Sequence, residues 1–337
     1  MADPVATTSH GREQVNCREP TITRSVFQVR TFGAFRYATT CLVRWVPCAS
    51  GQKGAGYDQK NLPAHRATCN SACWLPTQPS NDLPAIEGPA GGERLAGKFV
   101  WFDLLTDDPS AARAFYGELF GWDMEGLQSD PAYTVIRHNG EAIAGISDYE
   151  DQDAEVFESV WLPSLSVSDV DQAIQIACTR GAEILYGPLD AGQRGRLAVV
   201  RDPAGAELAF LASSDGDPVD RARRIGEWAW VDLFTLDPVA AAEFYGDLVG
   251  YQLRQVQDQG QTVSVLVRDG VARAGIVELP WDDIRPNWLS YVRVDDLDVA
   301  IARARSLGGW LVLRLDDVAV LADPTGAAIG VQQIDTP

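Results

Sequence analysis

The feature that most constrains this chain is an internal repeat. A stretch of 24 residues occurs twice, 129 positions apart, as FVWFDLLTDDPSAARAFYGELFGW from Phe99 and as WAWVDLFTLDPVAAAEFYGDLVGY from Trp228. Thirteen of the aligned positions are identical, and the alignment needs no gap. A repeat of this length indicates one structural unit used twice. The chain should therefore fold as two similar halves.

The repeated stretch is typical of a strand followed by a helix. Alternation predicts two faces for the strand, one formed by Val100, Phe102 and Leu104 and the other by Phe99, Trp101 and Asp103. Asp108-Pro109 supplies an N-cap and a proline for the first helical turn, and Gly121 ends the helix. The Phe-Tyr pairs at 115–116 and 244–245 stand at helical core spacing. We expect these aromatic pairs to pack under the sheet.

The remaining pattern predicts more strands and one more helix in each half. In the first half we expect strands at 133–137, 142–147, 161–167, 197–201 and 207–211, one near Ile184, another near Met124 or Val156, and a helix at 170–180. In the second half we expect strands at 262–267, 272–277, 288–294 and 328–332 and a helix at 297–307. Asp-Pro-x-Gly turns at 202–205 and 323–326 precede the last strands. The pattern predicts four β-α-β-β-β units.

Residues 1–96 differ from the rest of the chain. Residues 1–90 carry nine Lys and Arg against six Asp and Glu, whereas residues 91–337 carry 19 against 41. We predict that 1–96 form a poorly structured extension, which is either a transit peptide or an upstream extension of the reading frame without selected structure. The predicted first domain spans 97–214, the linker 215–226 and the second domain 227–335.

Charge and composition also limit the partners of the chain. A strongly acidic body repels polyphosphate, so we expect no nucleic acid partner. No uninterrupted apolar run of about 18 residues occurs, so we expect no membrane association. The body keeps a single cysteine, Cys178, as suits a reducing cytosol. We expect a cytoplasmic monomer or homodimer with a small-molecule ligand.

The order of these units resembles the vicinal oxygen chelate superfamily. That fold is shared by glyoxalase I, bleomycin-resistance proteins, fosfomycin-resistance enzymes and extradiol dioxygenases. The strand followed by D-P-x-x-A-x-x-F-Y and the D-P-x-G turn carry the resemblance over about residues 97–335. The opening W-F/V-D-L is most similar to a two-domain bacterial branch labelled hydroxylase or glyoxalase-like. The resemblance implies an α+β fold of two tandem glyoxalase-like domains, each a curved mixed sheet with outer helices and a ligand in the concavity.

The resemblance also implies three metal-ligand positions in each half, normally His, Gln or Glu. In this sequence those positions hold Trp101, Leu162 and Ala209 in one half, and Trp230, Leu289 and Gly330 in the other. None of these side chains ligates a divalent cation. We therefore expect no metal and no other cofactor.

The leading hypothesis is a metal-free protein that binds a small aromatic molecule in a Trp-lined cavity. The predicted ligand-binding residues are Trp101, Ser164, Glu207, Trp228, Trp230, Tyr291 and Arg293. Indole walls with a few polar groups suit a flat or cationic organic ligand. An interaction scaffold is a further interpretation.

The alternative is a lyase, isomerase or hydroxylase-like enzyme that uses acid–base chemistry without the usual metal. Asp103 and Asp232 would act as general bases if they are desolvated. In the non-catalytic interpretation, each accepts hydrogen bonds from backbone or indole N–H groups. Arg196 would neutralise a bound anion or pair with Glu207 across a hairpin. Because the second half has no arginine in that place, the sequence favours the first concavity as the working one.

Overall fold

Two eight-stranded sheets organise the chain. The computed structural model describes residues 83–86, 92–149, 159–258, 261–279 and 285–333. The strand order is β2-β3-β4-β1-β5-β8-β7-β6 in the first sheet and β10-β11-β12-β9-β13-β16-β15-β14 in the second. The predicted α+β fold of four β-α-β-β-β units is confirmed.

The elements of the first half follow the predicted order. They are β1 (Phe99–Thr106), α1 (Pro109–Phe120), β2 (Asp123–Leu127), β3 (Asp130–His138), β4 (Glu141–Asp148), β5 (Val160–Ser166), α2 (Val170–Thr179), β6 (Glu183–Asp190), a short 3-10 helix (Gly192–Arg194), β7 (Gly195–Arg201) and β8 (Glu207–Ser213). The additional strand is β2, which contains Met124. The other candidate position, Val156, lies outside the described residues.

The second half repeats this plan. Its elements are β9 (Trp228–Thr235), α3 (Pro238–Val249), β10 (Gln252–Asp258), β11 (Gln261–Arg268), β12 (Val271–Glu278), β13 (Asn287–Val294), α4 (Leu297–Ser306), β14 (Trp310–Leu315), β15 (Val318–Ala322) and β16 (Ala328–Gln333). The caps of α3 match those predicted for α1. The Asp237 side chain accepts the first free N–H groups, Pro238 stands in the first turn, and Gly250 ends the helix at φ 73°.

The repeated strands lie at the centre of each sheet. Strand β1 pairs parallel with β4 and antiparallel with β5, and β9 makes the same two pairings with β12 and β13. The two units of a half therefore meet along the β1–β5 pair in the first sheet and the β9–β13 pair in the second. Side chains of the repeated motif consequently project from the middle of each sheet, on its concave or its helix-covered face.

β-bulges shift which residues face the concavities. The pairing of β1 with β5 is irregular between Phe99 and Trp101, and one extra residue reverses the alternation there. Phe99 therefore packs in the core between the sheets, whereas Val100 joins Trp101 on the concave side. Our placement of these two residues was wrong. Trp228 lies at a similar irregularity and also packs in the core, so its predicted place in the concavity was wrong too.

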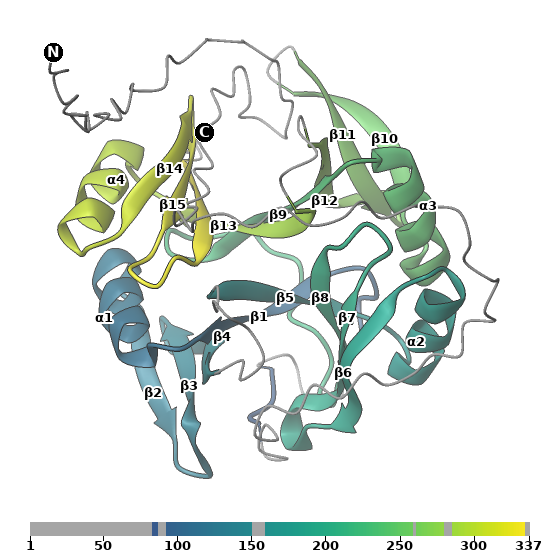
Figure 1. The fold of residues 1–337 in the computed structure, drawn as a ribbon, viewed down its shortest axis with the longest axis horizontal. Helices are drawn as coiled ribbons and strands as arrows, with labels where there is room; N and C mark the ends of the chain where they lie inside the picture. The colour runs from purple at the N-terminus through teal and green to yellow at the C-terminus, as the bar shows by residue number, and fades with distance from the viewer. Residues whose placement is uncertain (1–82, 87–91, 150–158, 259–260, 280–284, 334–337) are drawn as a thin grey trace, which may run out of the picture.

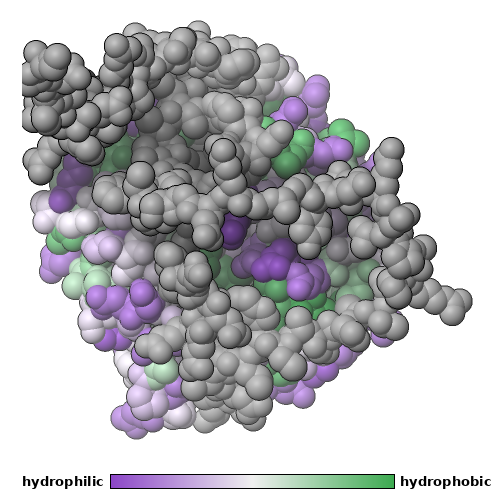
Figure 2. Space-filling model, viewed as in Figure 1, coloured by the Kyte–Doolittle hydropathy of each residue, from purple (hydrophilic) through white to green (hydrophobic). Residues whose placement is uncertain are grey.

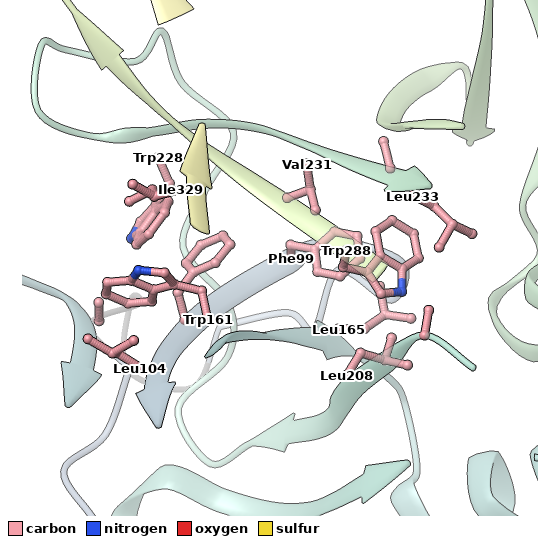
Figure 3. Packing of buried hydrophobic residues seen from close by; sticks show 14 of the residues in the cluster. Phe99, Leu104, Trp161, Leu165, Leu208, Trp228, Val231, Leu233, Trp288 and Ile329 are labelled. Atoms are coloured by element: carbon pink, nitrogen blue, oxygen red, sulfur yellow. The ribbon is translucent and has the colours of Figure 1, made fainter. Parts of the chain in front are cut away.

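One hydrophobic core joins the two halves. The sheets lie across one another in the centre of Figure 1, with α1 and α4 on one side and α2 and α3 on the other. The Trp228 ring stacks on Phe102 at 4.1 Å between centroids and meets Trp161 edge-on at 5.1 Å. Phe99 packs on Trp288 at 4.8 Å (Figure 3). The convex faces of both sheets are thus buried against each other.

Buried tyrosines of the repeated helices connect the halves by polar contacts. The Tyr245 hydroxyl on α3 donates to Asp202 Oδ2 at 2.9 Å and accepts from Trp288 Nε1 at 3.0 Å. The other carboxylate oxygen, Asp202 Oδ1, accepts three backbone N–H groups of its own Asp-Pro-x-Gly turn. This turn of the first half is therefore bonded to a helix of the second.

The reciprocal contact has the same parts. The Tyr116 hydroxyl on α1 accepts from Trp161 Nε1 at 2.8 Å and lies beside Asp323, in the turn of the second half. Burial and the Asp323 charge raise the pKa of Tyr116. Among the described residues, Asp323 Oδ2 finds no partner that meets hydrogen-bond geometry. The expectation that the Phe-Tyr pairs are core residues is confirmed, since all four side chains are buried.

Exposed apolar side chains are scattered over the surface. Figure 2 shows separate green patches among hydrophilic residues on the coloured part of one face. Val239 on α3 and Trp310 on β14 are among the exposed apolar residues. Single residues of this kind are ordinary on protein surfaces. The helices of the described part are all too short or too polar to cross a bilayer.

We predict that Tyr245→Phe lowers the free energy of unfolding by about 2–4 kcal/mol, because Asp202 Oδ2 and Trp288 Nε1 both lose a buried partner. Urea unfolding measures the loss. The matched control is Tyr186→Phe, whose half-buried hydroxyl makes no hydrogen bond to a described residue and should cost less than about 0.5 kcal/mol. Equal losses in the two variants would contradict the proposed role of the contact.

Candidate functional site

A tryptophan–aspartate pair marks the concave face of each half. The indole Nε1 of Trp101 donates to Asp103 Oδ1 at 2.9 Å, and Trp230 donates to Asp232 Oδ1 at the same distance. Residues two apart on a strand share one face, so both members of each pair project from the centre of the sheet. The repeat in the sequence therefore carries this pair into both halves.

Each pair depends on a glycine of the neighbouring strand. Gly145 on β4 lies opposite Asp103, and Gly275 on β12 lies opposite Asp232. A Cβ atom at Gly145 would stand 2.6 Å from Asp103 Oδ1, and one at Gly275 would stand 2.0 Å from Asp232 Oδ1. Only glycine leaves room for the carboxylate. Our sequence reasoning missed these residues, although Ala-Gly-Ile occurs at 144–146 and again at 274–276.

A tyrosine approaches each carboxylate, but from different strands. In the first half Tyr133 on β3 donates to Asp103 Oδ1 at 2.6 Å. In the second half Tyr291 on β13 lies beside Asp232, close enough to act on its pKa, although its hydroxyl meets no hydrogen-bond geometry with a described residue. Tyr291 was a predicted ligand-binding residue, whereas Tyr133 was missed because β3 lies outside the repeated stretch. The two sites are thus similar in composition and different in layout.

Asp232 is a buried carboxyl group with a raised pKa. It is 2% exposed, and burial raises its pKa to about 7, against the stabilising effect of the Trp230 N–H and the Tyr291 hydroxyl. At neutral pH the group is therefore present in both its neutral and its ionised form. Asp103 is only half-buried and is bonded by two donors, the Trp101 indole and the Tyr133 hydroxyl.

The first concavity is filled by side chains. Trp101 is fully buried, and the guanidinium of Arg194 lies 3.8 Å from the centroid of its ring. Leu83 and Ile86, from the extension before the first sheet, pack in the same cluster. We predicted that residues 1–96 lack a packed structure, and most of that extension lies outside the described residues. Residues 83–86 are an exception that closes over Trp101.

The second concavity is lined by apolar side chains. Its buried residues are Val277, Leu289, Tyr291, Leu315, Val318 and Val320. Trp230 and Phe234 pack against them and keep part of their surface exposed to solvent. Trp230 is therefore partly exposed, whereas Trp101 is fully buried.

The structure does not bring Arg196 into a concavity. Its guanidinium pairs with Asp171 at 2.8 Å and with Asp190 at 3.1 Å, beside an open surface hollow of about 370 Å³. The predicted pairing of Arg196 with Glu207 is wrong. Arg201, directly opposite Glu207 in the β7–β8 pairing, makes that ion pair at 2.8 Å. The reason for favouring the first concavity is therefore removed.

The other predicted ligand-binding residues are placed as follows. Ser164 is buried on β5, directly opposite Trp101. Arg293 donates from Nη1 to the carbonyl oxygen of Arg223 at 2.6 Å, so it is engaged by the segment between the two sheets. Trp228 donates to the carbonyl oxygen of Ile143 at 3.1 Å within the core. Of the second-half candidates, Trp230, Asp232 and Tyr291 are brought together.

The metal positions implied by the resemblance do not fit a metal. Strands β1, β5 and β8 are adjacent, and Trp101, Leu162 and Ala209 supply an indole, an isobutyl group and a methyl group there. In the second sheet, the Tyr291 ring lies over Gly330, so that a Cβ at this position would be 2.2 Å from the ring. Among the described residues no group of three His, Cys, Asp or Glu side chains is arranged to hold an ion.

Comparisons with known families agree with this architecture. A family model described as Glyoxalase/Bleomycin resistance protein/Dioxygenase superfamily matches residues 98–210, and one described as Glyoxalase-like domain matches residues 228–331. The chain is 30% identical over 256 residues to putative glyoxylase CFP32 of Mycobacterium tuberculosis, covering 72% of this chain and 97% of that protein. It is 29% identical to the anthracycline biosynthesis protein DnrV of Streptomyces peucetius, covering 70% and 92%.

Solved structures with a similar fold are more distant in sequence. The Mn(II)-bound glyoxalase from Novosphingobium aromaticivorans is 16% identical, with a TM-score of 0.49 over 71% of this chain and 82% of that one. A catechol 2,3-dioxygenase is 15% identical, with a TM-score of 0.47 over 72% and 94%.

Asp232 should make stability depend on pH. The pKa of Asp232 is about 7 in the folded chain, against an ordinary value of 3.8. Between about pH 4 and 7 the folded chain therefore holds this proton more tightly than the unfolded chain does. The free energy of unfolding should therefore fall as pH rises from about 4 to 7, by up to about 4 kcal/mol. Urea unfolding of Asp232→Asn should lack this component, read as the difference from the parent at each pH. A variant that keeps the full parental pH dependence would contradict the assignment of this component to Asp232.

Proposed function

Because the chain belongs to the Glyoxalase/Bleomycin resistance protein/Dioxygenase superfamily, we propose that it binds a small organic molecule with an aromatic body in its second concavity. The observation that carries the proposal is the partly exposed Trp230 indole, which Asp232 fixes in place above an apolar floor. A rigid indole gives a flat ligand a large contact area at little entropic cost.

The Asp232 carboxyl group suits a ligand with a hydroxyl, carbonyl or amine substituent. With a pKa of about 7, Asp232 is able to accept a hydrogen bond when ionised and to donate one when neutral. One relative is named for anthracycline biosynthesis, and an anthracycline combines a flat polycyclic body with such substituents. We therefore choose an anthracycline as the probe.

The expected lack of a metal and of a cofactor is part of this proposal and is supported by the side chains at the six implied ligand positions. A cytoplasmic location, a monomeric or dimeric state and the absence of nucleic acid and membrane partners stay predictions.

The raised pKa of Asp232 favours a second candidate function, proton transfer to or from the bound molecule. A general acid or base works best when its pKa lies near the working pH, as it does here. Asp103 and Arg196, the other two proposed catalytic residues, lie outside the second concavity. Enzymatic activity would therefore depend on Asp232 alone among the three.

We predict that Trp230→Leu weakens binding of an anthracycline about tenfold, because loss of the aromatic contact removes roughly 1–1.5 kcal/mol. Equilibrium dialysis measures the affinity. Trp310→Leu is the matched control, since Trp310 on β14 is 48% exposed and belongs to neither concave cluster. The parental affinity should be kept in the control. Equal loss in both variants, or no binding to the parent, would count against the proposal.

The same dialysis experiment distinguishes binding from catalysis. If the protein only binds, the recovered probe is chemically unchanged by mass spectrometry in every variant. If Asp232 transfers protons, the parent converts the probe and Asp232→Asn does not, although it still binds. Conversion that persists unchanged in Asp232→Asn would exclude Asp232 as the acid–base group.

A further inference from the structure

The first concavity holds a short piece of the chain itself. Leu83 is 5% exposed and Ile86 is 2% exposed, and both pack in the cluster that contains Trp101, Tyr133 and Leu211. Two large aliphatic side chains thus replace solvent above the first indole. Burial of both side chains favours binding of the segment and opposes the entropy cost of ordering it.

The backbone of this segment is recognised as well as its side chains. Arg194 donates from Nε to the carbonyl oxygen of Pro84 at 2.8 Å, and its backbone N–H donates to the carbonyl oxygen of Leu83 at 3.1 Å. One residue therefore binds two successive carbonyl groups. Pro84 also restricts the segment and the residue before it to extended conformations, which suits such a contact.

Arg194 is built into the concavity. It is 1% exposed, its guanidinium lies against the Trp101 ring, and Nη2 reaches the Tyr133 hydroxyl at 3.4 Å. Tyr133 in turn donates to Asp103. A buried cation is costly unless its N–H groups are bonded, and the Pro84 carbonyl satisfies Nε. Without the segment, Nε would lose that buried acceptor.

We propose that the first concavity is a binding site for an extended apolar peptide, and that residues 83–86 are the occupant it holds in cis. Leu83 and Ile86 fill its apolar part, and Arg194 recognises the carbonyl groups between them. The proposal concerns the first half alone and does not rest on ligand binding in the second.

The tether explains why the occupant stays bound. Gly92 follows Ile86 by six positions in the sequence, and its backbone N–H donates to the carbonyl oxygen of Asp215 at 3.0 Å, so the occupant is covalently joined to a fixed point nearby in the chain. A short linker gives an effective concentration of the order of millimolar. A peptide added in trans therefore competes only when the segment in cis is weakened.

The test uses the full chain with Leu83→Glu and Ile86→Glu together, which places two charges against the apolar cluster. A fluorescent peptide with the sequence of residues 81–86, NDLPAI, is added and its anisotropy is followed. We expect binding to the double variant at least tenfold tighter than to the parent. The control peptide carries glutamate in place of its leucine and isoleucine and should not bind to either protein.

Adding Arg194→Lys to the double variant tests the recognition of the carbonyl groups. Lysine keeps the charge but lacks the Nε–H group in that geometry, so peptide affinity should fall about tenfold. Equal affinity of the peptide for parent and double variant would overturn the proposal. So would absence of binding to a double variant whose near-ultraviolet circular dichroism matches that of the parent.

A measurement on the unmodified protein covers the case in which the variant does not fold. Thermolysin cleaves before large apolar residues, so the bond between Ala85 and Ile86 should be cut much more slowly in the native parent than in the urea-unfolded chain. Cleavage at equal rates in the two states would show that the segment does not occupy the concavity.

Discussion

The arrangement of the two halves depends on two buried tyrosine hydroxyls, one from each half, which lie against a turn of the other half. Tyr245 bonds the Asp-Pro-x-Gly turn of the first half, and Tyr116 stands beside the matching turn of the second. Because each tyrosine also accepts an indole N–H, the convex faces of both sheets are held in one arrangement. The repeated motifs thus build the interface between the halves and leave the concave faces free to differ.

Because the concave faces differ, the same Trp–Asp pair has different surroundings in the two halves. In the first half Tyr133 and Arg194 surround the pair, and residues 83–86 cover it. In the second half apolar residues surround Trp230, and burial brings the pKa of Asp232 to about 7. One copy of the motif is covered by residues 83–86, and the other keeps part of the Trp230 surface exposed.

The sequence predicted the repeat, the helix caps and the order of the units, because local spacing determines these. It could not predict the bulges that move Phe99 and Trp228 into the core, since an inserted residue leaves no mark in an apolar strand. Arg194 and Arg196 are two residues apart, and the sequence does not distinguish their roles. Of the two, only Arg194 reaches Trp101. The buried role of residues 83–86 depends on a long-range contact that no local period indicates.

The proposed ligand site depends on a difference in exposure, because Trp230 is partly exposed and Trp101 is fully buried. Hydroxyl-radical footprinting of the native protein, read by peptide mass spectrometry, compares the oxidation rates of the two tryptophans without any ligand. The account predicts that Trp230, which is partly exposed, is oxidised several-fold faster than Trp101, which is fully buried. Equal rates, or faster oxidation of Trp101, would contradict it.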